Sequence, residues 1–403
     1  MKIARPPLTV RKTIHCQPAE NRASGRPLCA KSAQFTLSVV MVMVMLMASF
    51  SQGLGASGLP QTSIFGFGAG LNENNTNMEN AILIARQNGF DWISLELDWA
   101  KLQPSQEQPI NIAWIQRSAQ MADQQQISIL IKIVNAPAWA VTPNGPSSEL
   151  VSNLISQVAQ SIPANVLAFE IFPGANIAVN WGAPANPSAY FEMLLAAERT
   201  LLRLNSRGFI IPSIAPLNES HSESDMDDLE FLKTLYSINN GVLPLSIIGI
   251  NYSTTNLLGN PANNPLNDPI HSLRRYELVR DVMKKANAAD GLIWVTSFSW
   301  PVELTDKQQQ ASWIYEAYKQ LQGQLFIGAA FFQTMNSLNN TDTNPALISF
   351  DSNQHPALRM IQSLTQVVNP VSGNGNQVSA PDQQNGSFFD RLIAIILSWF
   401  EQP

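Results

Sequence analysis

Eight β-rich runs alternate in strict order with eight helix-like segments between Ser63 and Val367, and this alternation constrains the fold more than any other feature of the chain. The predicted strands are Ser63–Gly68, Trp92–Leu97, Ile127–Val134, Val166–Phe172, Phe209–Ile214, Leu245–Asn251, Ile293–Phe298 and Phe326–Gln333. The predicted helices are Met78–Gln87, Ala113–Gln124, Glu149–Ile162, Ala189–Leu204, Leu229–Ile238, Leu273–Ala288, Lys307–Leu321 and Pro356–Thr365. Eight such units predict an α/β fold, a single-domain (β/α)8 TIM barrel over residues 58–368.

Chain length and helix-capping residues agree with this prediction. A (β/α)8 barrel runs to about 250 residues or more as one domain, so 403 residues leave room for flanking segments. Asn186-Pro187 precedes the fourth predicted helix and Thr305-Asp306 the seventh. These residue types cap the first turn of a helix.

The first 57 residues have the layout of an export signal. Residues 1–34 carry seven Lys or Arg and one acid, Glu20, for a net charge of +6. An uncharged apolar run, Phe35 to Phe50, and then small residues follow. The run is shorter than the roughly 20 apolar residues of a membrane span, which favours a cleaved signal over an uncleaved anchor. Either reading predicts an extracellular or cell-surface protein, with membrane contact possible through residues 35–50.

Charge and cysteine placement exclude several function classes for the exported part. Because the whole chain carries −6 and the basic arm +6, residues 35–403 carry −12. Nucleic acid binding requires a basic face, so it is not expected. Cys16 and Cys29 both precede the apolar run, which leaves no thiol for disulfides, catalysis or metal binding. The histidines have no metal-ligand spacing, so neither a metal nor an organic cofactor is expected.

The C-terminal tail is predicted as a separate piece. Residues 369–387 are rich in Gly, Asn, Gln, Ser and Pro and are interpreted as a flexible linker. Residues 388–403 place their polar side chains in one stripe and leave a wide apolar face, as in an amphipathic helix. This face is expected to cover a partner, the membrane interface through residues 388–400, or the barrel itself.

Several strand ends carry motifs that can be compared with known patterns. Phe90–Trp99 is similar to W-V-R-F-D-V-D-W, Asn135–Ala140 to G-A-P-A-W-A, and Ile248–Tyr252 to L-G-V-H-P. Ile348–Ala357 is similar to a D-G-x-P-K-P-A closing turn. By these motifs the barrel resembles the clan A glycoside hydrolases (cellulase and xylosidase-like enzymes). The resemblance covers nearly the whole barrel and implies an O-glycosyl hydrolase.

The fourth and seventh strands of that clan end in the catalytic motifs E-I-W-N-E-P-N and W-I-T-E-F-G-W. Residues 170–176 of this chain are E-I-F-P-G-A-N, and residues 294–300 are W-V-T-S-F-S-W. The resemblance therefore puts the acid/base glutamate at Gly174, its asparagine neighbour at Pro173 and the nucleophile at Ser297. Ser94 stands where an active-site arginine is usual, and Asn251 where a histidine is usual. All five departures fall on the active-site ring.

These replacements matter because retaining glycoside hydrolysis needs two carboxyl groups about 5 Å apart. Glycine supplies neither a proton nor a nucleophile, and a serine without an adjacent base is a weak nucleophile. A positioned acid or base contributes about 10²–10⁴ in rate. The sequence therefore predicts no catalytic residue at the family positions, and a barrel that is inactive or has recruited other acids.

Other acids could have replaced the missing glutamates. Glu96 and Asp98 end the second strand on one face, and Glu303 lies in the connection after the seventh strand. They are the weak substitutes, and hydrogen bonding to barrel backbone and caps is the favoured alternative for Glu96 and Asp98. Glu219 and Glu223, in the connection after the fifth strand, are weak candidates of the same kind as Glu303. Glu170 is expected deeper in the barrel, as an interior polar group.

The mouth of the predicted barrel keeps aromatic and polar side chains that suit a sugar. Aromatic faces stack on pyranose rings, and amides, hydroxyls and carboxylates bond to sugar hydroxyls. The alternative for each aromatic is packing over the barrel. The candidate ligand-binding residues are Trp139, Trp181, Asn251, Tyr252, Ser297 and Trp300, with Glu96 as a further hydrogen-bonding group.

Three hypotheses follow from these observations. The first is an exported, catalytically inactive glycosidase-like barrel that binds carbohydrate or an envelope partner protein at its mouth. The second is an active glycosidase with relocated carboxylates. The third is a structural cell-envelope protein, held by its apolar ends, whose mouth binds nothing.

Overall fold

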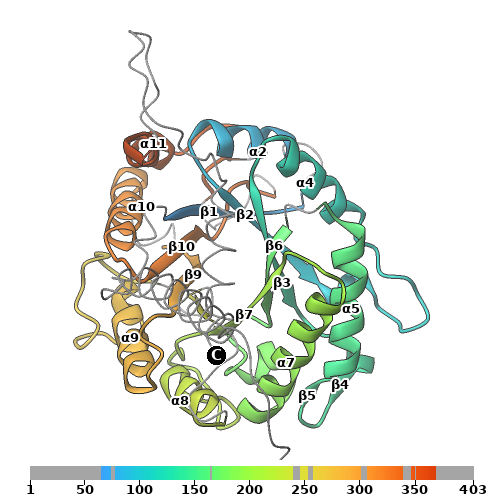
Figure 1. The fold of residues 1–403 in the computed structure, drawn as a ribbon. Coiled ribbons are helices and arrows are strands. Elements are labelled where there is room, and N and C mark those ends of the chain that lie inside the picture. The colour runs from blue at the N-terminus through green and yellow to red at the C-terminus, as the bar shows by residue number, and fades with distance from the viewer. Residues whose placement is uncertain are drawn as a thin grey trace, which may run out of the picture. The chain divides into compact units, whose positions relative to one another are not determined.

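The computed structural model describes residues 65–73, 78–163, 166–238, 246–252, 257–300, 306–338, 346–349 and 351–368. Within them, eight parallel strands close into a barrel, and helices form a ring outside it (Figure 1). The barrel strands are β1 (Gly66–Leu71), β2 (Trp92–Asp98), β3 (Ser128–Val134), β6 (Val166–Ile171), β7 (Phe209–Ile214), β8 (Ile247–Asn251), β9 (Leu292–Phe298) and β10 (Ile327–Phe332). The predicted (β/α)8 fold is confirmed.

Neighbouring strands follow the order of the chain, and β1 pairs with both β2 and β10 to close the barrel. The β2–β3 pair is regular along its whole length, from Trp92↔Ser128 to Asp98↔Val134. The β8–β9 pair contains a register shift near its C-terminal end. All strands point the same way, so the connections that follow them gather at one end of the barrel. We call that end the mouth.

The helices of the outer ring present apolar faces to the strands and are capped where the sequence predicts. Asn186 Oδ1 accepts a hydrogen bond from Ala189 N at 3.0 Å, and Asp306 Oδ1 accepts two from the first turn of its helix at 2.9 Å. The helices are α2 (Met78–Gln87), α3 (Trp99–Leu102), α4 (Ala113–Gln124), α5 (Ser148–Ser161), α6 (Ala178–Trp181), α7 (Pro187–Arg203), α8 (Asp228–Ile238), α9 (Tyr276–Lys285), α10 (Lys307–Gln322) and α11 (Pro356–Val368), with short 3-10 turns η2 (Ala138–Ala140) and η3 (Leu273–Arg275).

The core has an inner and an outer part. Inside the barrel, a small apolar cluster includes Trp92, Leu130, Ala168 and Trp294, and the two indole rings meet edge to face at 4.9 Å. The larger cluster lies between strands and helices. Because side chains alternate along a strand, members of the inner cluster identify which positions face the barrel axis.

The structure departs from the predicted elements in few places. The first strand lies at Gly66–Leu71 rather than 63–68, and a short antiparallel pair, β4 (Val141–Thr142) and β5 (Gly145–Pro146), was not expected. The apolar run 35–50, the linker 369–387 and the tail 388–403 lie outside the described residues. None of the helices in the described part of the chain is long and apolar enough to span a membrane.

Candidate functional site at the barrel mouth

A row of charged residues crosses three neighbouring strands below the mouth. Glu96 of β2 pairs in register with Lys132 of β3, and Lys132 pairs with Glu170 of β6. Each lies an even number of positions after an inner-cluster residue, so all three face the barrel axis. Neighbouring strands are about 4.8 Å apart. Glu96 is exposed, whereas Lys132 and Glu170 are buried.

Glu170 is an interior polar group, as predicted. Its side chain is fully buried, and its Oε1 accepts hydrogen bonds from Ser213 Oγ and Thr296 Oγ1, both at 2.6 Å. Its Oε2 has no hydrogen-bond partner among the described residues. Burial raises the pKa of Glu170, although the Lys132 charge and the two hydroxyl hydrogen bonds act in the opposite direction.

Lys132 links this row to the far side of the barrel. Its Nζ donates to the backbone oxygen of Thr296 at 2.7 Å, and only 4% of the residue is exposed. Thr296 therefore contacts both ionisable side chains, Lys132 through its carbonyl and Glu170 through its hydroxyl. The motif comparison missed this role of Thr296 because it singled out the next residue, Ser297, as the family nucleophile position.

Gly174, the family acid/base position, is tightly enclosed. Its φ of +71° is in the left-handed region, which favours glycine. A Cβ placed there would lie 2.8 Å from the Ala215 Cβ and 2.9 Å from the Asn180 Nδ2. Asn180 also donates to Pro173 O at 3.0 Å. Both the backbone conformation and the packing therefore leave no room for a side chain at this position.

Ser297, the family nucleophile position, lies beside Asn251. The two residues pair across β8 and β9, while Ile250 pairs with Val295, so Thr296 is the extra residue of a bulge. Ser297 is 2% and Asn251 3% exposed. The bulge brings these two predicted ligand-binding residues together, and both are almost fully buried.

Three of the four candidate aromatics are buried and bonded to the backbone of mouth connections. Trp181 Nε1 donates to Asn144 O at 3.0 Å, Tyr252 Oη to Leu273 O at 2.8 Å, and Trp300 Nε1 to Gly259 O at 3.0 Å. Each is at most 1% exposed. As packed in this structure, none offers a ring face to a sugar, and the packing alternative accounts for all three positions.

Trp139 is the candidate aromatic that keeps part of its surface. It is half-buried in η2, meets Trp99 edge to face at 5.4 Å, and donates from Nε1 to Gln103 O at 3.3 Å. These contacts hold the ring in place while leaving it accessible. Trp139 therefore remains the best candidate for stacking.

The substitute acids occupy different environments. Asp98 caps α3 by accepting from Lys101 N at 3.2 Å, and its other oxygen accepts from Lys101 Nζ and Asn135 Nδ2 at 3.0 Å. Partial burial would raise the pKa of Asp98, but these bonds lower it overall. Asp98 is thus an ionised cap rather than an acid with a proton to give. Glu219 and Glu223 are exposed, and Glu303 lies outside the described residues.

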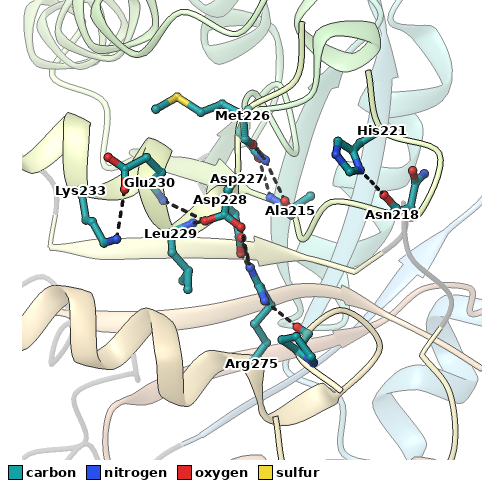
Figure 2. Close-up of polar contacts among 12 residues, drawn as sticks. Ala215, Asn218, His221, Met226, Asp227, Asp228, Leu229, Glu230, Lys233 and Arg275 are labelled. Atoms are coloured by element: carbon teal, nitrogen blue, oxygen red, sulfur yellow. Dashed lines mark hydrogen bonds and ion pairs between the residues drawn. The ribbon is translucent and has the colours of Figure 1, made fainter. Parts of the chain in front are cut away.

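A buried ion pair beneath the mouth was not predicted. Arg275 donates from Nε to Asp228 Oδ2 at 2.8 Å, contacts Asp228 Oδ1 through its Nη2, and reaches Pro269 O at 2.6 Å (Figure 2). Asp228 is fully buried, and the side chain of Arg275 is 5% exposed. The pair connects the start of α8 to the β8–α9 connection. No sequence spacing indicates it, because the partners are 47 positions apart.

Asn176, the last residue of the fourth-strand motif, has a scaffold role. Its Nδ2 donates to Ala215 O at 2.9 Å and to Met226 O at 2.8 Å, and its Oδ1 accepts from Ala215 N at 2.9 Å. The residue joins the β6–α7 connection to both ends of the β7–α8 connection. In the described part of the chain, no three His, Cys, Asp or Glu side chains lie close enough to hold a metal ion.

Several solved structures that are similar to this chain are glycoside hydrolases. A family 39 glycoside hydrolase from Bacteroides cellulosilyticus WH2 has a TM-score of 0.56 at 14% identity, over 78% of this chain and 66% of that protein. A β-glycosidase has 0.56 at 12%, over 79% and 99%. An endo-β-1,4-glucanase from Xanthomonas axonopodis pv. citri has 0.53 at 10%, over 76% and 99%. No protein-family model matches the chain, and no curated protein does. The similarity establishes the fold.

Proposed function

We propose that this chain is an exported, glycoside-hydrolase-like barrel that binds carbohydrate at its mouth without hydrolysing it. Export is inferred from the basic arm and apolar run of residues 1–50. Carbohydrate is inferred from the shared fold, since the neighbouring structures are glycoside hydrolases. A shared fold does not imply a shared activity. The residues of the mouth therefore determine whether a sugar is only bound or is also hydrolysed.

The observation that carries the proposal is the packing around Gly174. A position that had merely lost a glutamate would retain the space for one. Here Ala215 and Asn180 fill that space and the backbone has a conformation suited to glycine. Ser297 is likewise almost fully buried. This supports a mouth that is adapted to the absence of both carboxylates.

The same mouth retains groups that can hold a sugar. Trp139 offers part of a ring face, and Glu96 offers an exposed carboxylate on the inward side of β2. Asn251 and Ser297 pair across β8 and β9, but both are almost fully buried, so Trp139 and Glu96 are the accessible groups. A stacking ring with a few converging polar groups is the usual composition of a sugar site.

The test is equilibrium binding of the purified full-length protein to a glycan array, together with release of chromophore from a panel of aryl glycosides. Binding without release is expected. Trp139→Ala should weaken binding, and Trp313→Ala, a half-buried tryptophan on α10, is the matched control that should not. Release abolished by a mouth substitution would refute the proposal.

A second candidate, an active glycosidase with relocated carboxylates, is favoured by one observation. Glu96 is exposed and faces the axis in the same row as Glu170, a carboxyl whose pKa is raised by burial. If this pair supported turnover, Glu96→Gln would abolish aryl glycoside release. Unchanged release in that variant would remove this candidate.

A further inference from the structure

We propose that Gln103 is a positioning residue of the sugar site, because it fixes the orientation of Trp139, the ring proposed to stack on a sugar. This inference rests on the proposed carbohydrate binding and deepens it. It adds a residue that acts on affinity through Trp139 rather than through the sugar.

Gln103 stands where α3 ends and the connection from β2 to α4 begins. Its N–H donates to Trp99 O at 2.9 Å, which closes the last turn of α3. The next residue is Pro104, and a proline disfavours the helical conformation at the residue before it. Gln103 accordingly has φ −143° and ψ 76°. Because it has left the helical conformation, its carbonyl oxygen can accept a hydrogen bond from a different connection.

Three groups of Gln103 hold three different segments of the mouth. Its Oε1 accepts from Trp99 Nε1 at 3.0 Å, and its Nε2 donates to Gln108 O at 2.9 Å. Its backbone oxygen accepts from Trp139 Nε1 at 3.3 Å. Gln103 therefore braces the connection after β2 and joins it to η2, in the connection after β3.

Two contacts of the Trp139 ring involve Gln103. The first is the hydrogen bond from the indole N–H to the Gln103 oxygen. The second is the edge-to-face contact with Trp99, at 5.4 Å and 84°, because the Trp99 indole is itself bonded to Gln103 Oε1. The partly accessible ring is thus held in one orientation before a sugar binds, and such pre-organisation raises affinity.

Other bonds join the same two connections without Gln103. Ala100 N donates to Asn135 O at 2.8 Å, and Asn135 Nδ2 donates to Asp98 Oδ2 at 3.0 Å. Removal of the Gln103 side chain should therefore loosen the Trp139 ring without separating the two connections. The predicted effect is local, on the affinity for sugar rather than on the folding of the barrel.

The test is calorimetric titration of the full-length protein with the tightest-binding oligosaccharide found on the array. Gln103→Ala removes the bonds to Trp99 and Gln108, and should weaken binding about threefold to tenfold. Gln320→Ala is the matched control, since Gln320 is a half-buried glutamine of α10 whose Nε2 donates to Tyr276 Oη at 3.1 Å. It should leave the affinity unchanged.

Two readouts separate positioning of Trp139 from a general structural role. In a Trp139→Ala background, Gln103→Ala should cause no further loss of affinity, because residues that act through one another are not additive. The second readout needs no ligand. Near-ultraviolet circular dichroism reports fixed aromatic packing, and the Trp139 signal is the difference between a protein and its Trp139→Ala variant. That signal should be smaller with Gln103→Ala and unchanged with Gln320→Ala.

The outcomes distinguish this inference from the proposed function. An unchanged affinity for Gln103→Ala, an equal loss in both backgrounds, or an unchanged Trp139 signal would overturn the inference and leave carbohydrate binding standing. No binding of any oligosaccharide by the wild-type protein would overturn the proposed function, and the positioning role with it.

Discussion

Replacing Gly174 by alanine tests whether the family acid/base position is closed to a side chain. The left-handed φ of +71° costs a non-glycine residue about 1–2 kcal/mol. The new Cβ would also lie 2.8 Å from the Ala215 Cβ and 2.9 Å from the Asn180 Nδ2, and such overpacking costs about 1–3 kcal/mol. Gly174→Ala should therefore lower the free energy of unfolding by about 2–5 kcal/mol.

Gly182→Ala is the matched control, because it carries the cost of the left-handed backbone conformation without the overpacking. Gly182 also has a left-handed φ, +80°, but its added Cβ would meet only Val141 methyl groups, at 3.4 and 3.6 Å. Gly182→Ala should therefore lower the free energy of unfolding by only about 1–2 kcal/mol. Urea titration followed by tryptophan fluorescence measures both values. Adding Ala215→Gly to the Gly174 variant should recover part of the loss, as coupled neighbours do. Equal costs for the two alanine variants, with no recovery, would refute the closed-site reasoning.

Three further predictions concern other parts of the barrel. Asp228→Asn, which leaves Arg275 buried without its charge partner, should lower the free energy of unfolding by about 3–5 kcal/mol; a loss below 1 kcal/mol in urea titration would contradict this. Trp300→Ala should lower the free energy of unfolding by about 3–5 kcal/mol. Trp139 is half-buried, so Trp139→Ala should lower it less and should mainly weaken glycan binding. A larger loss of stability for Trp139→Ala than for Trp300→Ala would show that the mouth is packed differently. Burial raises the pKa of Asp91 to about 6 from 3.8, so the folded state holds this proton more tightly and stability should fall as pH rises from about 4 to 6. Asp91→Asn should flatten that decline, and an unchanged pH profile would show that Asp91 titrates normally.

The strands and helices could be predicted because local sequence determines them. Inward-facing positions recur at every second residue along each strand, as in Ala168 and Glu170 of β6. Amphipathic helices with capping residues follow the strands. The bulge at Thr296 could not be predicted, because it depends on how β9 pairs with β8. It decides which of Thr296 and Ser297 reaches Glu170.

The mouth was predicted less completely than the barrel, because long connections return over it. Motif comparison locates Gly174 and Ser297, and alternation places Glu170 inside. Burial of Trp181 and Trp300 depends on contacts with Asn144 and with Gly259, each about 40 positions away in the chain. No local pattern in the sequence indicates such contacts, so an aromatic that packs a connection looks the same as one that faces a ligand.

The most direct test of the account measures binding and hydrolysis in the same sample. The full-length protein is mixed with the tightest-binding oligosaccharide found on the array; calorimetry gives the bound fraction, and reducing ends are counted over several days against a protein-free control. The account predicts saturable binding with no reducing ends above the control. Reducing ends that accumulate in proportion to protein, and that Glu96→Gln abolishes, would contradict it.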